Sequence, residues 1–218
     1  MISRRDFTKG MIITLLFGCQ EQELRKIEGT AKFKEEYIKR YDIDFLIPIV
    51  DPKKEKYIQT NLEIYNSLAL SERINFSRTY YCWNVDTKLE LKYNYTLFKP
   101  LFEEIAALYG CDWTILAKIA LKESNMSPKK INRKSGARGL MQVMPFYFYN
   151  LDPLDPLHNI LVGTGVYVTE LKRTRNHIDA LEAYNRGYSA FREQQKVGEL
   201  NYRFAMNILH TNLDRIIE

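Results

Sequence analysis

The chain has 218 residues, which suits one medium domain with an appendage and is long enough to bury a hydrophobic core. Apolar residues make up 45% and charged residues 27% of the sequence, as in an ordinary soluble globular protein. The net charge of +5 is too small to indicate a nucleic-acid-binding protein, which carries a denser basic face. The three cysteines form no Cys-x-x-Cys pair and the three histidines lack ligand spacing, so we expect no metal site and no cofactor.

The first 18 residues are similar to an export signal that ends at a lipid-modified cysteine. Residues 3–9 read Ser-Arg-Arg-Asp-Phe-Thr-Lys, which resembles the twin-arginine motif, and residues 11–17 form an apolar run of signal-core length. Residues 16–19 resemble a lipobox that would make Cys19 the lipidated first residue, although its phenylalanine is larger than usual. Because Gln20 follows, we expect a periplasmic lipoprotein of the outer membrane. The alternative is an ordinary N-terminus with paired arginines by chance.

Two further cysteines, Cys82 and Cys111, remain if Cys19 carries a lipid. An oxidising periplasm would allow them to form a disulfide. Two buried free thiols are at least as good an interpretation, so the sequence leaves both open.

Residues 19–95 form an N-terminal segment to which the sequence assigns no function. The charged part over residues 21–40 is typical of a solvated helix or tether, and residues 56–70 have the pattern of another helix. Residues 74–95 are rich in aromatic and branched side chains that favour β-structure. We therefore expect a short hairpin there, turning near residues 84–88.

From residue 96 onward the apolar residues recur with helical spacing, so residues 96–218 are predicted to form a mainly α domain. Pro100 suits the first turn of a helix that stops at Gly110. Asp112 is a good N-cap for the next helix, over residues 113–125. The remaining predicted elements are a helix or turn opened by Pro145 and helices over residues 157–173, 177–185 and 201–217.

One carboxylate, Glu123, falls on the apolar face of the helix predicted over residues 113–125, one turn after Ile119. Burial disfavours the charged form of a carboxyl, and the negative end of the helix dipole does the same in the last turn. Both effects favour a neutral acid at working pH, which a general acid for glycosidic cleavage requires. By position alone, a glutamate paired with Lys122 or Arg138 is an equally good interpretation.

Three short motifs follow in order along the C-terminal half. Residues 123–128 read Glu-Ser-Asn-Met-Ser-Pro, residues 135–145 read Ser-Gly-Ala-Arg-Gly-Leu-Met-Gln-Val-Met-Pro, and residues 183–187 read Ala-Tyr-Asn-Arg-Gly. One such motif would be weak evidence, but the three together resemble the SLT-type lytic transglycosylase domain, most of all in membrane-bound lytic murein transglycosylases. The resemblance covers about residues 96–215. It implies a lysozyme-like helical catalytic domain with a deep glycan cleft, behind a small appendage.

The resemblance implies an enzyme that cleaves peptidoglycan strands without water. Glu123 would protonate the oxygen of the β-1,4 bond between N-acetylmuramic acid and N-acetylglucosamine. It would then accept the proton of the muramoyl C6 hydroxyl as that oxygen closes on C1, leaving a 1,6-anhydro end. One carboxylate suffices because the N-acetyl group and C6 hydroxyl of the substrate replace the second carboxylate of hydrolytic glycosidases.

The same resemblance implies further site residues that bind substrate or shape the cleft: Ser124, Ser135, Gln142, Met144, Tyr184 and Asn185. Tyr184 would orient the acid. Ser127 and Arg133 depart from the residues usual in the family, and Ser135 is expected to compensate for the serine that Arg133 replaces. Glu182 is interpreted as a surface charge.

Other functions stay open at this point. A lysozyme-like muramidase would use Glu123 with a second carboxylate and water, and a non-catalytic envelope scaffold would only bind glycan. A transglycosylase dedicated to a secretion apparatus has the same motifs as one for general wall turnover. The expected partners are peptidoglycan strands, the membrane through the lipid on Cys19, and envelope or secretion machinery, with no nucleic acid.

Overall fold

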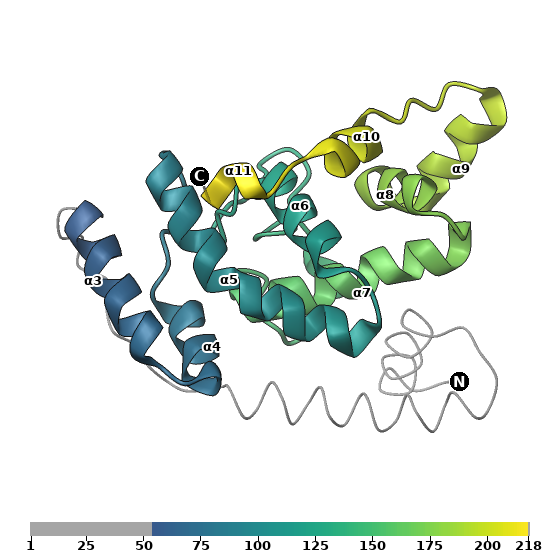
Figure 1. The fold of residues 1–218 in the computed structure, drawn as a ribbon. Coiled ribbons are helices and arrows are strands. Elements are labelled where there is room, and N and C mark those ends of the chain that lie inside the picture. Colours follow the sequence, from purple (N-terminus) through teal and green to yellow (C-terminus); the bar gives the residue numbers. More distant parts are fainter. Residues whose placement is uncertain (1–53, 218) are drawn as a thin grey trace, which may run out of the picture. The chain divides into compact units, whose positions relative to one another are not determined.

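The computed structural model describes residues 54–217, whose regular structure is helical apart from isolated β-bridges (Figure 1). The mainly α fold class predicted from the sequence is therefore confirmed. The predicted export signal with Cys19, and the charged segment that follows it, lie outside the described residues. In the part of the chain that is described, no helix is both long and apolar enough to cross a membrane.

The described chain divides into two compact units. The larger unit contains residues 54–163 and 211–217, and the smaller unit contains residues 164–210. The helices of the larger unit are α3 (Lys54–Ser67), α4 (Leu70–Thr79), α5 (Lys88–Tyr109), α6 (Trp113–Ser124), the 3-10 helix η1 (Pro145–Tyr147) and α11 (Asp214–Ile217). The helices of the smaller unit are α8 (His177–Arg186), α9 (Tyr188–Val197) and α10 (Arg203–His210). Helix α7 (Pro156–Thr174) begins in the larger unit and ends in the smaller one.

Helix α5 is the centre of the larger unit, and α3, α4, α6 and α11 all pack against it. It begins with a capping box, in which Thr87 accepts a hydrogen bond from the Glu90 backbone and Glu90 accepts one from the Thr87 backbone. It ends at Gly110, whose left-handed backbone has φ 65°. Its core face consists of side chains with no exposed surface at helical spacing: Leu97, Phe98, Leu101, Phe102 and Ile105.

The hairpin predicted over residues 74–95 is wrong, because residues 74–79 complete α4 and residues 88–95 begin α5. Four of the aromatic side chains that suggested strands, Phe76, Tyr81, Tyr93 and Tyr95, are buried instead, whereas Trp83 is exposed. Tyr93 is 1% exposed and donates its hydroxyl hydrogen bond to the carbonyl of Tyr80. Tertiary burial here overrides the β propensity of these residues.

Pro100 does not begin a helix as predicted, since it lies in the interior of α5. A proline has no backbone N–H, so the carbonyl of Thr96 loses its helical donor. Tyr65 of α3 donates a hydrogen bond to that carbonyl at 3.4 Å. Helix α3 therefore packs where the hydrogen-bond ladder of α5 is interrupted, and residue 96, the predicted start of the catalytic domain, lies within this continuous helix.

Helix α6 forms where the sequence predicted it, with the side chain of Asp112 accepting a hydrogen bond from the Thr114 backbone at 2.8 Å. The single last helix predicted over residues 201–217 is instead α10 and α11. The break comes where the Asn212 side chain accepts a hydrogen bond from the Asp214 backbone and starts α11. Helix α9, which ends at the left-handed Gly198, was not predicted.

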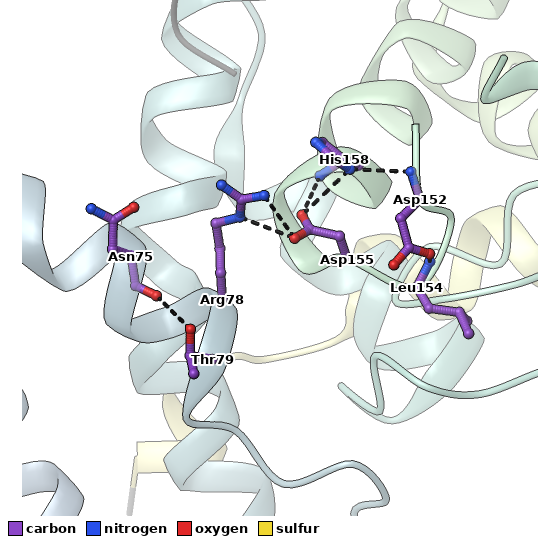
Figure 2. A network of polar contacts seen from close by, with 7 residues as sticks. All are labelled: Asn75, Arg78, Thr79, Asp152, Leu154, Asp155 and His158. Carbon is purple, nitrogen blue, oxygen red and sulfur yellow. Dashed lines mark hydrogen bonds and ion pairs between the residues drawn. The ribbon is translucent and has the colours of Figure 1, made fainter. Parts of the chain in front are cut away.

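A polar network within the larger unit joins α4 to the start of α7 (Figure 2). Arg78 contacts the Asp155 carboxylate through its Nε at 3.0 Å and through a terminal nitrogen at 2.9 Å. The other oxygen of Asp155 accepts a hydrogen bond from the His158 backbone at 3.0 Å, and His158 Nδ1 accepts one from the Asp152 backbone at 3.2 Å. Both side chains of the ion pair are largely buried, so the contact fixes α4 to the loop before α7.

Candidate active site

Glu123 lies in the last turn of α6, at the end of its buried face. Leu116, Ile119 and Ala120 of that face have no exposed surface, whereas Glu123 is half-buried. Burial raises the pKa of the Glu123 carboxyl from 4.5 to about 7, although the charge of Lys130 and then that of Lys122 lower it. A large share of this carboxyl is therefore protonated near neutral pH, in the direction that the sequence predicted.

The glutamate does not adopt the paired arrangement that its position alone left open. No described residue forms an ion pair or a hydrogen bond with the Glu123 carboxylate. Lys130 instead donates a hydrogen bond from Nζ to the backbone carbonyl of Glu123, at 2.9 Å. The carboxyl is thus held by its backbone and keeps both oxygens for a ligand.

Ser124 fixes the end of α6 from inside the protein. Its hydroxyl donates to the carbonyl of Ala120 at 2.9 Å and accepts from the Ser127 backbone at 3.2 Å. With 1% of its surface exposed, Ser124 is placed to shape the turn after Glu123 and not to touch a ligand.

The turn after α6 is strained and is held by a segment that precedes α5. Asn125 and Met126 both have left-handed backbones, with φ 55° and 58°. The Asn125 side chain donates to the carbonyl of Val85 at 3.1 Å, and the Val85 backbone donates to the hydroxyl of Ser127 at 2.9 Å. These two hydrogen bonds fasten residues 125–127 to the chain before α5.

Asn94 of α5 completes this attachment and was missed in the sequence. It has no exposed surface, and its amide donates to the carbonyls of Met126 at 2.9 Å and Cys82 at 2.8 Å. Its side-chain oxygen accepts from the Cys82 backbone at 2.8 Å. The available signal was a polar asparagine between Tyr93 and Tyr95, on the face of α5 that joins the core.

The second motif folds into a compact series of turns on a buried asparagine of α7. Arg138 forms isolated bridges with Ile131 and with Val143. Asn159 has no exposed surface, donates to the carbonyl of Arg138 at 2.9 Å and accepts from the Met141 backbone at 2.7 Å. A Cβ at Gly139, where φ is 78°, would overlap the amide nitrogen of Asn159, so only glycine fits there. Asn159 was not predicted from the sequence.

Gln142 connects this motif to the turn after Glu123. Its amide donates to the carbonyls of Lys130 at 3.1 Å and Gly139 at 2.8 Å, from a backbone with φ 48°. Met144 is half-buried immediately before η1. Ser135 is exposed in a turn, where its hydroxyl accepts a backbone hydrogen bond at 3.3 Å. The structure therefore links Gln142 to Glu123 through Lys130, and places Ser135 farther along the same loop.

The third motif lies in the smaller unit, in the last turn of α8. Tyr184 is half-buried there and Asn185 is exposed. The interpretation of Glu182 as a surface charge is wrong, because this side chain has no exposed surface. Its oxygens accept hydrogen bonds from the Ala205 backbone at 2.9 Å and from Arg186 at 3.0 Å, which joins α8 to α10.

Cys82 and Cys111 are both half-buried and form no disulfide, so of the two states that the sequence left open the structure has the one without the bridge. Burial raises the pKa of the Cys111 thiol to about 11, with a smaller contribution from Asp112, which keeps it uncharged. Within residues 54–217, no group of three metal-ligating side chains comes together.

Comparisons with known proteins agree with these motifs. The model of the Transglycosylase SLT domain family matches residues 100–207, which include all three motifs. The chain is 31% identical over 110 residues to Membrane-bound lytic murein transglycosylase F 1 of Alkalilimnicola ehrlichii, covering 46% of this chain and 22% of the relative. It is 29% identical over 113 residues to Membrane-bound lytic murein transglycosylase F of Desulfosudis oleivorans, covering 47% of this chain and 24% of the relative.

The chain spans less than a quarter of the length of these curated relatives. No solved structure matches it at a significant level. The family match contains Glu123 with its helix, the turns built on Asn159, and Tyr184. Residues 100–207 of this chain are therefore a Transglycosylase SLT domain.

Proposed function

We propose that this chain is a peptidoglycan lytic transglycosylase and that Glu123 is its single catalytic acid and base. The observation that carries the proposal is the half-buried Glu123 carboxyl, whose pKa burial raises to about 7, within an SLT domain. The names of both relatives, as lytic murein transglycosylases, support the substrate class.

In the proposed reaction, protonated Glu123 gives its proton to the oxygen between N-acetylmuramic acid and N-acetylglucosamine, and the bond from that oxygen to C1 breaks. The resulting carboxylate takes the proton of the muramoyl C6 hydroxyl, whose oxygen then bonds to C1. The products are a 1,6-anhydromuramoyl end and a free hydroxyl on N-acetylglucosamine, so no water is consumed. A pKa near 7 suits a group that first donates and then accepts a proton.

The other residues act in two ways in this proposal. Ser124 and Gln142 use their side chains to hold the turns around Glu123, so they position the acid. Ser135, Met144, Tyr184 and Asn185 are assigned to substrate contacts, on the motif resemblance that the family match supports.

We also propose that the protein is exported and anchored through a lipid on Cys19. The support is the order of the N-terminal motifs, with paired arginines, an apolar run and then Gly-Cys, together with the description of both relatives as membrane-bound. Metabolic labelling with a radioactive fatty acid tests the anchor. Label should enter the membrane-associated chain and be lost with Cys19→Ala, and unchanged labelling of that variant would refute it.

The activity is tested by incubating the chain from residue 20 onward with purified sacculi and determining product masses. Glu123→Gln runs alongside, because it keeps the shape of the side chain and removes its titration. Products lighter by one water than hydrolysis products, absent with the variant, are expected. Hydrolysis products would indicate a muramidase with a second carboxylate. Binding to sacculi without products from either protein would indicate a glycan-binding scaffold.

A further inference from the structure

The positive charge of the protein is concentrated in the segment around Glu123. Between Asp112 and Asp152 the only acidic residue is Glu123, whereas seven residues are cationic. These are Lys118, Lys122, Lys129, Lys130, Arg133, Lys134 and Arg138. The stretch therefore carries +6, while the whole chain carries +5, so the remaining residues together carry −1. Such segregation creates a local positive potential.

The cations that follow α6 lie on one loop beside Glu123, and we call Lys129, Lys130, Arg133, Lys134 and Arg138 the basic loop. Lys130 contacts the Glu123 backbone at 2.9 Å. Arg138 forms a bridge with the residue after Lys130, which closes the loop at its base.

The exposed end of the basic loop is an ordered turn. The Asn132 side chain accepts hydrogen bonds from the backbones of Lys134 at 3.0 Å and Ser135 at 3.2 Å. Arg133 and Lys134 are both exposed in this turn. Because three residues of chain span at most about 11 Å, the Cα of Arg133 lies within that distance of Lys130. The two charges at the tip are therefore held close to the carboxyl end of α6.

Within the described residues, no acidic side chain forms an ion pair with the basic loop. The ion pairs of arginine and lysine in that part of the chain lie elsewhere, and they include Arg78–Asp155, Lys99–Glu103, Arg173–Glu170 and Arg186–Glu182. Lys129 lies over the ring of Tyr81, 5.8 Å from its centre. The Nε of Arg138 is buried and has no hydrogen-bond partner within residues 54–217.

We propose that the basic loop binds carboxylate groups that the glycan strand carries beside the scissile bond. This inference rests on the proposed function and names the part of the substrate that the site selects. Neutral sugar hydroxyls give no reason for a cluster of unpaired cations, whereas arginine and lysine form strong charge-assisted hydrogen bonds with carboxylates. The carboxylates have two sources: the lactyl group of a muramoyl residue without peptide, and the peptide that extends from this group.

The test compares binding of three forms of the same soluble strands: peptide-bearing, stripped of peptide, and with every carboxylate converted to a methylamide. All proteins are the full chain and carry Glu123→Gln so that no strand is cleaved. Arg133→Gln/Lys134→Gln removes the exposed tip of the basic loop. The matched control, Lys56→Gln/Arg215→Gln, removes one exposed lysine and one exposed arginine elsewhere in the larger unit.

We expect the loop variant to raise Kd about three- to tenfold on carboxylate-bearing strands at low salt, since an exposed charge pair contributes on the order of 1 kcal/mol. The control should stay within about twofold, by the same estimate, and all proteins should bind the neutral strands alike. A loss only with peptide-bearing strands assigns the carboxylates to the peptide. A loss only with stripped strands assigns them to the lactyl group, whose carboxyl is amide-linked wherever a peptide is attached. A loss with both strands shows that the loop binds carboxylates from either source.

Equal Kd values for the loop variant and its parent, or an equal loss on neutral strands, would overturn the proposal. So would an effect confined to phosphatidylglycerol vesicles, which would assign the loop to a lipid surface. The chain without the Glu123 substitution is assayed separately on sacculi. If the chain cleaves sacculi but the loop variant binds all strands as its parent does, only the carboxylate site is refuted. If the loop variant loses binding but the chain does not cleave sacculi, only the proposed activity is refuted.

Discussion

Asn94 of α5 donates a hydrogen bond to the backbone carbonyl of Met126 at 2.9 Å. A fully buried side chain outside the matched residues 100–207 therefore holds the turn that directly follows Glu123. The same asparagine makes two hydrogen bonds with Cys82, so three segments of the chain meet on one amide.

Asn94→Ala should lower kcat while leaving KM nearly unchanged, because it releases the turn after Glu123 without removing a group assigned to substrate contact. It leaves buried backbone groups unsatisfied, so we expect a loss of about 2 to 4 kcal/mol in unfolding free energy. Steady-state kinetics with soluble strands and urea unfolding measure the two effects.

Ser77→Ala is the matched control, since Ser77 is equally buried and donates to the carbonyl of Leu97 at 2.6 Å, away from the turn. It should lose stability and keep kcat at temperatures where the protein is folded. If both variants lose kcat in proportion to their stability, Asn94 has no positioning role.

The rate of cleavage should fall as pH rises through about 7, because the protonated form of Glu123 starts the reaction. Lys130→Gln should move this alkaline limb to higher pH, since the Lys130 charge lowers the pKa of Glu123. Lys129→Gln, which removes the neighbouring charge above Tyr81, should leave the limb in place. The measurement is a pH profile of kcat/KM for the unsubstituted chain and the two variants. An alkaline limb that does not move in Lys130→Gln would contradict the prediction.

Glu123 should also make the protein less stable as pH rises. Its pKa is raised in the folded state, so the folded protein binds this proton more tightly than the unfolded chain does. The cost of ionisation is absent below pH 4.5 and complete above about pH 7, where a shift of this size corresponds to roughly 3 kcal/mol. Glu123→Gln should therefore be more stable than the unsubstituted chain at pH 8 and nearly equal to it at pH 4. Unfolding at both pH values measures this, and a constant difference would contradict it.

Gly139→Ala should prevent stable folding of the second motif, with a loss of about 3 kcal/mol or more, because the new Cβ overlaps Asn159 and the backbone is left-handed. Gly136→Ala has the same left-handed strain, with φ 81°, but meets no atom within 4 Å. It should cost about 1 kcal/mol, for the strain alone. Thermal unfolding of both variants separates overlap from strain, and equal losses would show that the overlap is relieved.

The sequence was sufficient to predict helix α6 and the position of Glu123 on its apolar face, because the signals that determine both are local. Asp112 caps the helix two residues from its partner, and Glu123 falls on the apolar stripe by spacing alone. The roles of Asn94 and Asn159 were not predictable in this way, because Asn94 contacts Met126, which is 32 residues away.

The incorrect predictions for residues 74–95 and for Glu182 also arise from contacts between residues that are far apart in the sequence. The side chains of residues 74–95 favour strands locally, and only their burial against other helices makes this segment helical. Glu182 looked like a surface charge because its backbone partner, Ala205, is 23 residues further along the chain.

The contact between Arg78 and Asp155 has a practical consequence for anyone who shortens this protein. A fragment cut at residue 96 follows the motif resemblance, yet it would remove Arg78, the counter-charge of Asp155, together with the first two turns of α5. It would also uncover the surface of α5 that α3 and α4 cover. The smallest fragment suited to expression therefore begins before α3, well upstream of the residues that carry the motifs.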